Sequence, residues 1–226
     1  MARETVPPLR RRLAAEGLGS FLLFATVIGS GVMAEALAGG NVALALLGNT
    51  LATGAMLFVL IAMLGPISGA HMNPAVSLVN ATRGELGWTD AGLYIIVQIA
   101  AGTLGAWVVH LMFDLPILQF STKARSGIGQ WTGEAVATFG LIVTILGTVK
   151  MREWAVPASV ALYITAAYWF TSSTSFANPA ITIVRSLSNS FAGIAPHDVP
   201  MFVVAQILGA TLGAIVSRLL FDAERS

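Results

Sequence analysis

The chain contains no cysteine and few charged residues. Of its 226 residues, only 10% are Asp, Glu, Lys or Arg, whereas a soluble domain carries about 25%. The absence of cysteine excludes disulfides, thiol nucleophiles and metal sites built on thiolates. The three histidines, His71, His110 and His197, lie too far apart along the chain to suggest a ligand cluster. We therefore expect neither a metal nor a cofactor.

Apolar sequence is what the chain has in excess. Hydrophobic residues make up 56% of the composition, and the mean hydropathy is +0.79. The formal net charge of +1 gives no reason to expect a nucleic-acid partner. No nucleophile–base pair, phosphate-binding loop or metal-ligand spacing stands out, so we do not expect an enzyme. The composition predicts one all-α integral membrane domain.

Uncharged runs predict six membrane-spanning helices, because each span needs about 20 apolar residues. The runs cover about residues 14–34, 42–63, 91–113, 131–149, 156–174 and 199–220. The first run follows a basic segment but lacks an Ala-x-Ala cleavage site, which favours a retained span over a signal peptide. Six spans put both termini on one side, and the excess of Lys and Arg predicts that this side is cytoplasmic. Only Lys123, Arg125 and Arg185 fall on outer segments.

The tripeptide Asn-Pro-Ala occurs twice, each time inside a charge-free run that is too long for a single span. The two copies are Asn73-Pro74-Ala75 and Asn178-Pro179-Ala180. Asn is a preferred helix N-cap and Pro is favoured at the first helical position, so each copy predicts a helix start. A helix start at bilayer depth is tolerated only where it is buried in protein or lines a wet cavity. We therefore expect two re-entrant half-helices whose N-termini meet near the membrane midplane, around a pore or a binding site.

The two halves of the chain repeat one another. Glu16 corresponds to Glu134 at an offset of 118 residues, and Gln98 corresponds to Gln206 at an offset of 108. Three spans separate the two Asn-Pro-Ala copies, so the halves have opposite orientations and the site is expected between them. The predicted organisation is a basic tail at 1–12, a single channel domain at 13–221 and a C-terminal tail at 222–226, with repeat one at about 13–113 and repeat two at about 131–221.

The two asparagines are the first candidates for pore residues. Helix N-termini and amide N–H groups that face a pore favour an oxygen lone pair and oppose a cation. A water molecule held between Asn73 and Asn178 donates outward in both directions, which interrupts proton hopping. The pair therefore predicts passage of neutral solutes and exclusion of protons and metal cations.

The two acids inside spans are the next candidates. A carboxylate in a membrane span is costly and is usually paired or functional. Because Glu16 and Glu134 occupy corresponding positions, we favour braces for the re-entrant loops over a proton relay. His71 either lines the cytoplasmic approach or bonds a loop carbonyl. We expect His110 to be interfacial.

These motifs resemble the aquaporin, or major intrinsic protein, family, and in particular its aquaglyceroporins. The resemblance rests on the two Asn-Pro-Ala copies, the run around the first copy, the acids in spans one and four and the inverted repeat, over about residues 13–221. It implies six spans plus two half-helices, a homotetramer with one pore per protomer and, by similarity to bacterial members, an inner-membrane location. It also implies that Asn73 and Asn178 are the central donors and that Glu16 and Glu134 brace the loops.

One position departs from the family pattern. Members of the family usually carry Arg directly after the second Asn-Pro-Ala, at the outer constriction, whereas this chain has Ile181. By spacing, the other three constriction positions are Thr53, Ala166 and Ser175, with Ala167 as the alternative to Ala166. These side chains are small or apolar, which predicts a wide pore that admits solutes larger than water.

Arg185 follows Ile181 by four residues, one helical turn further out. Its side chain either leans into the outer vestibule or binds a lipid headgroup or a loop carbonyl. The aromatics Tyr163, Tyr168 and Trp169 on the fifth span are expected to pack or to lie at the interface.

The combined reading predicts a passive channel for small uncharged solutes. The family pattern is similar to that of bacterial members that pass glycerol-like polyols and trivalent arsenicals such as arsenite or its methylated forms, with water alongside. An ion-coupled transporter is the alternative, with Glu16, Glu134 and His71 as its only coupling candidates. A water-selective channel is a second alternative, and it is disfavoured by the small side chains of Thr53 and Ala166.

Overall fold

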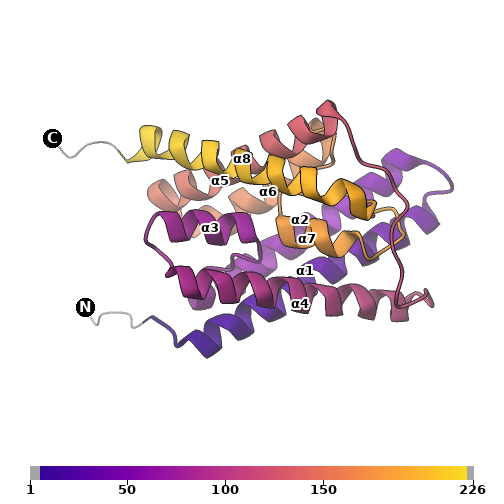
Figure 1. Cartoon of the computed structure of the whole chain (residues 1–226), viewed down its shortest axis with the longest axis horizontal. Helices are drawn as coiled ribbons and strands as arrows, with labels where there is room; N and C mark the ends of the chain where they lie inside the picture. The colour runs from indigo at the N-terminus through magenta and orange to yellow at the C-terminus, as the bar shows by residue number, and fades with distance from the viewer. Residues whose placement is uncertain (1–5, 223–226) are drawn as a thin grey trace.

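The computed structural model describes residues 6–222, and all regular secondary structure in that range is helical (Figure 1). The long helices are α1 (Leu9–Leu37), α2 (Val42–Ser68), α4 (Trp88–Met112), α5 (Ile128–Arg152), α6 (Val156–Phe170) and α8 (Val199–Phe221). The short helices are α3 (Pro74–Thr82) and α7 (Pro179–Arg185), and two 3₁₀ turns are η1 (Glu153–Ala155) and η2 (Pro196–Asp198). Six long helices and two half-helices confirm the predicted fold class.

The long helices have the length and the surface of membrane spans. Within the described residues, five helical stretches are long and apolar enough to cross a membrane, and one of them, Ile128–Phe170, contains α5, η1 and α6 together. Their outward faces expose large apolar side chains, among them Leu51, Phe58, Ile96, Leu104, Leu208 and Leu212. Such a surface is unfavourable in water and is stabilised by lipid. The chain is therefore an integral membrane protein.

The predicted span 156–174 is longer than the helix that forms there. Helix α6 ends at Phe170, and Thr171 already has an extended backbone with ψ of 138°. The residues that follow form the second re-entrant loop, so part of the uncharged run belongs to the loop and not to the span. The start of α1 and the end of α8 lie at the same end of the molecule, as an even number of spans requires (Figure 1).

Close helix contacts repeat between the two halves. Helix α1 packs against α4, and α5 packs against α8 in the same way. A Cβ atom on Gly105 would lie 2.5 Å from the carbonyl oxygen of Phe21, and one on Gly213 would lie 2.7 Å from that of Phe139. Only glycine allows these backbones to approach so closely, as in small-residue packing between membrane helices. These contacts fix the two helix pairs that hold the loops between them.

Candidate pore and its two re-entrant loops

Both re-entrant loops use the same unusual backbone. Positive φ angles occur at Gly69 (86°), Ala70 (48°) and Met72 (46°) in the first loop, and at Thr174 (61°), Ser175 (49°) and Ala177 (48°) in the second. Each pair of positions is related by the offset of 105 that relates the two asparagines. Non-glycine residues with positive φ are uncommon and persist only where surrounding contacts hold them. Contacts from the surrounding helices must therefore stabilise this loop conformation.

Glu16 holds the first loop through both of its carboxylate oxygens. Oε1 accepts from the hydroxyl of Ser68 at 2.7 Å and from the backbone N–H of His71 at 2.9 Å. Oε2 accepts from the N–H of Met72 at 2.7 Å and from the side-chain amide of Gln98 at 2.8 Å. The carboxylate is fully buried, and four donors offset its loss of hydration.

Glu134 makes the corresponding contacts with the second loop. Its carboxylate accepts from the backbone N–H groups of Phe176 at 2.8 Å and Ala177 at 2.9 Å, and from the side-chain amide of Gln206 at 2.5 Å. The same Gln206 amide group reaches the hydroxyl of Thr182 in α7 at 2.8 Å. This network joins α5, α8, the second loop and α7. Two of the three donors to Glu134 are backbone N–H groups of the loop.

Each Asn side chain caps its own half-helix. The Oδ1 atom of Asn73 accepts from Ala75 N at 2.9 Å, and that of Asn178 accepts from Ala180 N at 3.0 Å. In both copies a buried proline follows at the first helical position, where its missing N–H removes one orphan donor. The half-helices begin at the two tripeptides, as the sequence predicts.

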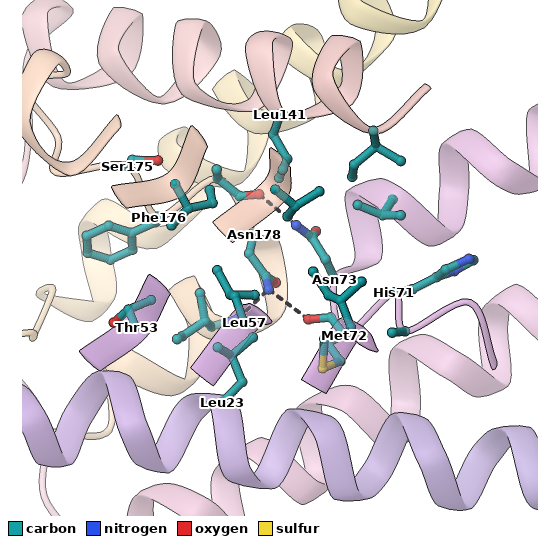
Figure 2. Close-up of a pocket in the computed structure, with 18 of the residues that line it drawn as sticks. Leu23, Thr53, Leu57, His71, Met72, Asn73, Leu141, Ser175, Phe176 and Asn178 are labelled. Atoms are coloured by element: carbon teal, nitrogen blue, oxygen red, sulfur yellow. Dashed lines mark hydrogen bonds between the residues drawn. The ribbon is translucent and has the colours of Figure 1, made fainter. Parts of the chain in front are cut away.

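The two loops are joined to each other through the same amides. Asn73 Nδ2 donates to the carbonyl oxygen of Ala177, and Asn178 Nδ2 donates to that of Met72, each at 2.8 Å. Figure 2 shows the two amides converging from opposite sides, with a dashed bond from each to the other loop. An amide nitrogen carries two N–H groups, so one N–H of each Asn remains for a solute.

A cavity runs past this pair of amides. At the end nearer the two chain termini, here called the inner end, the cavity is bordered by His71, Asn80 and Val149, and at the opposite end, called the outer end, by Ser175 and Arg185. Between these ends one wall is aliphatic and consists of Leu23, Val27, Leu57, Leu141, Val160 and Ile164. The opposite side carries the loops, with their carbonyl groups and amides (Figure 2). A path with one apolar wall and one polar wall suits a solute that has both apolar and hydroxyl surface.

Three of the four residues predicted for the outer constriction line this cavity. Thr53, Ser175 and Ile181 are buried and border it. Ala166 does not, because it lies on the exposed face of α6. Ala167 is buried but does not border the cavity either. The assignment of Ala166 by spacing therefore places it on the wrong face of the helix.

Tyr168 occupies the place that spacing gave to Ala166. It is buried, it borders the cavity, and its hydroxyl donates to Thr53 Oγ1 at 3.3 Å. The helical period could have revealed this, since Tyr168 continues the four-residue rhythm of Val160 and Ile164. The sequence predicts only a packing or interfacial role for Tyr168. The residue also borders the path, which that prediction missed.

The two predicted polar candidates beside the path, His71 and Arg185, have distinct surroundings. His71 borders the inner end, and within residues 6–222 its ring has one hydrogen-bond partner, the hydroxyl of Ser77 at 3.1 Å from Nδ1, in place of the loop carbonyl expected as the alternative. Arg185 borders the outer end, is 2% exposed, and donates its Nε–H to the carbonyl of Ala192. Arg185 therefore combines two of the expected alternatives: it borders the outer vestibule and it binds a loop carbonyl.

His110 is buried and not interfacial. Its two ring nitrogens lie 2.9 Å from the carbonyl of Ile117 and 3.0 Å from the hydroxyl of Ser188. It thereby ties the end of α4 to the loops on the outer side. Within residues 6–222 no group of three His, Cys, Asp or Glu side chains is arranged to hold a metal ion.

Comparison with known proteins agrees with this geometry. Residues 4–171 match the family model for the major intrinsic proteins. The chain is 54% identical to aquaglyceroporin AqpS of Rhizobium meliloti (strain 1021), over 96% of this chain and 93% of that protein. It is 30% identical to aquaporin NIP1-1 of Arabidopsis thaliana, over 92% of this chain and 73% of that protein.

A solved structure shares the fold. The X-ray structure of the aquaglyceroporin from Plasmodium falciparum superposes with a TM-score of 0.64 at 18% identity, over 96% of both chains. At this identity the likeness concerns the fold alone. Taken with the family match and the paired Asn-Pro-Ala loops, these findings show that the chain belongs to the major intrinsic protein family, as a membrane channel of the aquaglyceroporin type for small solutes.

Proposed function

We propose that this channel passes small uncharged solutes passively and in both directions. Its cargo is glycerol-like polyols and trivalent arsenicals, arsenite or its methylated forms, together with water. The observation that carries the proposal is Ile181 at the outer end of the cavity, where its apolar side chain borders the path beside Thr53 and Ser175. With Ile181 in place of a guanidinium, and Thr53 and Ser175 small, Tyr168 is the only bulky side chain that we assign to the constriction, and we propose that a three-carbon polyol or a pyramidal trihydroxide passes it.

Exclusion of protons and cations follows from the centre of the path. The N-termini of α3 and α7 face the cavity from opposite sides, and each contributes a partial positive charge. The remaining N–H groups of Asn73 and Asn178 favour a solute oxygen as acceptor. A cation meets two positive helix ends, and a central water donates its protons outward. We therefore assign ion exclusion to Asn73 and Asn178 together with the helix N-termini that they cap.

The other predicted residues receive structural or selective roles. We assign the outer constriction to Thr53, Ser175 and Ile181, with Tyr168 as the fourth member. Glu16 and Glu134 are the braces that hold the loops, because their oxygens are occupied by loop N–H groups. We take residues 13–221 as one channel unit that assembles as a homotetramer in a bacterial plasma membrane, with both termini cytoplasmic.

An ion-coupled transporter is the competing function. It requires an acid that releases and binds a proton during each cycle. Glu16 and Glu134 are fully buried and accept four and three hydrogen bonds respectively, so a proton on any of their oxygens must displace a bond that holds the loop or its helix. Solute uptake that rises with an imposed proton gradient would support the transporter. Uptake that is independent of the gradient supports the channel.

The test replaces the residue that carries the proposal. Purified protein in liposomes is assayed for water permeability and for glycerol and arsenite uptake, with the wild type, Ile181→Arg and Ile181→Leu. A guanidinium at this place narrows the path, so we expect Ile181→Arg to lower glycerol and arsenite uptake by about tenfold and to affect water less. Ile181→Leu conserves volume and is the control. Unchanged uptake in Ile181→Arg would refute this assignment of the constriction.

A further inference from the structure

The outer end of the cavity holds a positive charge whose hydrogen-bonding groups are mostly unused. Arg185 is 2% exposed and borders the cavity, yet within residues 6–222 only its Nε–H has an acceptor, the carbonyl of Ala192. A guanidinium carries five N–H donors. The four N–H groups on its two Nη atoms therefore remain free at the cavity wall.

A second guanidinium lies close to the first. Arg125, in the loop between α4 and α5, is 8% exposed and donates to the carbonyls of Gly193 at 2.8 Å and Ser173 at 3.1 Å. The Cζ atoms of Arg125 and Arg185 lie 4.9 Å and 3.2 Å from the centroid of the same ring, that of Phe176. Figure 2 shows this ring beside Thr53 and Ser175 on the path. The two charges thus share one aromatic ring at the outer mouth.

No carboxylate forms an ion pair with either guanidinium in the part of the chain that the structure describes. Within residues 6–222, neither guanidinium lies within 4.0 Å of a carboxylate oxygen. The nearest buried acids are already bonded: Glu134 to loop N–H groups, and Asp198 to the backbone N–H of Arg125 at 2.7 Å. The nearby Lys123 adds a third positive charge and donates to the carbonyl of Phe191 at 2.6 Å. Buried charge without a partner is costly and favours a counter-ion.

A neutral donor completes the arrangement. Ser175 borders the cavity, and its buried Oγ has no hydrogen-bond partner within residues 6–222. We propose that Arg185 and Ser175 form a binding site for a small monovalent carboxylate, with Arg125 supplying additional positive charge behind Phe176. The guanidinium fork matches two oxygens on one carbon, and the serine hydroxyl donates a further hydrogen bond to one of them.

The site lies on the proposed solute path, and only its effect on flux rests on the proposed function. A carboxylate bound at the outer mouth occupies the space that a polyol must cross. Formate and acetate, added outside, therefore compete with glycerol entry. The same charge repels metal cations before they reach the two asparagines.

Binding can be tested without any transport. Formate has a single proton resonance, which broadens when formate exchanges with the purified full-length protein in detergent. We expect broadening with the wild type and an affinity about tenfold or more lower for Arg185→Met, because a charged hydrogen-bonded pair contributes about that factor. Arg152→Met makes the same substitution at an exposed cytoplasmic residue and is the matched control. Equal broadening with Arg185→Met and the wild type, or none with the wild type, would overturn the proposal.

Two milder variants keep the test decisive if Arg185→Met does not fold. Ser175→Ala removes one donor, and Arg185→Lys keeps the charge but removes the fork, so both should bind formate more weakly than the wild type. Unchanged formate binding in both variants would overturn the proposal.

Transport separates this proposal from the function. External formate should slow glycerol influx into proteoliposomes of the wild type and leave Arg185→Met unaffected. Glycerol influx that is insensitive to formate would overturn the placement of the site on the solute path and leave the proposed function intact. Formate broadening without any glycerol influx would support the carboxylate site and contradict the proposed function.

Discussion

The inner and outer mouths of the path are built on the same scaffold and differ in the residues that surround it. His71 and Phe176 occupy corresponding positions in the two loops, two residues before each Asn. His71 meets the edge of Tyr94 at a centroid distance of 5.4 Å, and Phe176 meets Phe202 in the same way at 5.2 Å. The residues that border the inner mouth include no guanidinium, whereas the outer mouth has two guanidiniums over its aromatic ring.

A single hydroxyl explains much of this difference. In the first half, Tyr94 donates its hydroxyl to the carbonyl of Ser68 at 3.1 Å. The corresponding Phe202 has no hydroxyl, and the corresponding carbonyl, that of Ser173, accepts from Arg125 instead. The loop needs a donor at this carbonyl in both halves. In the outer half the donor is charged, which brings a fixed positive charge to the mouth.

The largest effect is expected at the feature that the halves share. Replacing Glu16 or Glu134 by Gln puts an NH₂ group against backbone N–H donors and should cost about 2–4 kcal/mol of unfolding free energy. Glu16→Gln should be the more harmful, since Glu16 accepts four hydrogen bonds and Glu134 accepts three. Thermal unfolding in detergent measures both, with the exposed Glu153→Gln as control. An unchanged midpoint for either variant would contradict the bracing role.

The donors to the two loop carbonyls should show a smaller, graded effect. Tyr94→Phe removes one hydrogen bond and should cost about 1 kcal/mol. Arg125→Met should cost more, because this side chain also donates to Gly193 and stacks on Phe176. The two effects should add in the double variant, since each residue acts on a different loop. Denaturation in detergent provides the comparison, and a cost for Tyr94→Phe that equals or exceeds that for Arg125→Met would contradict the larger contribution assigned to Arg125.

Selectivity should respond to Tyr168 and not to Ala166. Tyr168→Ala removes a ring from the path, so uptake of four- and five-carbon polyols should rise about two- to fivefold relative to glycerol. Ala166→Phe adds a ring on the exposed face of α6 and should leave uptake unchanged. Proteoliposome swelling across a polyol series measures both variants. A change with Ala166→Phe alone would reinstate the assignment made by spacing.

The smallest effect is a dependence of carboxylate affinity on pH. Burial, with the neighbouring charges of Arg125 and Arg185, lowers the pKa of Lys123 to about 8, while Glu35 acts in the opposite direction. Raising the pH from 7 to 9 therefore removes this positive charge from the outer mouth. Formate affinity should fall about two- to threefold over this range through the lost Coulomb attraction. Lys123→Met should bind formate with the lower affinity throughout, and an affinity that rises with pH would contradict the account.

Much of the fold could be predicted from the sequence because membrane spans and helix caps are local signals. The half-helix starts at Asn73 and Asn178, the six spans and the repeat all follow from runs and spacings within a few dozen residues. The structure also supplies the loop contacts expected for Glu16 and Glu134. These contacts follow from the cost of leaving a carboxylate alone inside a span.

The outer mouth could not be predicted in the same way. Arg125 donates to Ser173, 48 residues further along the chain, and to Gly193, 68 residues further. No local sequence pattern predicts contacts of this kind. Ala166 was assigned by spacing between motifs, which ignores the exact face of a helix. The four-residue spacing of Val160, Ile164 and Tyr168 shows which face of that helix borders the cavity, and Ala166 is not on it. The interfacial location expected for His110 is wrong because its partners, Ile117 and Ser188, lie on loops that no local pattern places beside it.

The central claim is that solutes pass between the two asparagines and then between Ile181 and its neighbours. Because the chain has no cysteine, a single cysteine can be placed at Ile181 and, as control, at Ala166. A small methanethiosulfonate reagent should reduce glycerol uptake by Ile181→Cys almost to that of empty liposomes, and glycerol should protect against it. The reagent should leave uptake by Ala166→Cys unchanged. Full uptake by a completely labelled Ile181→Cys would contradict the claim.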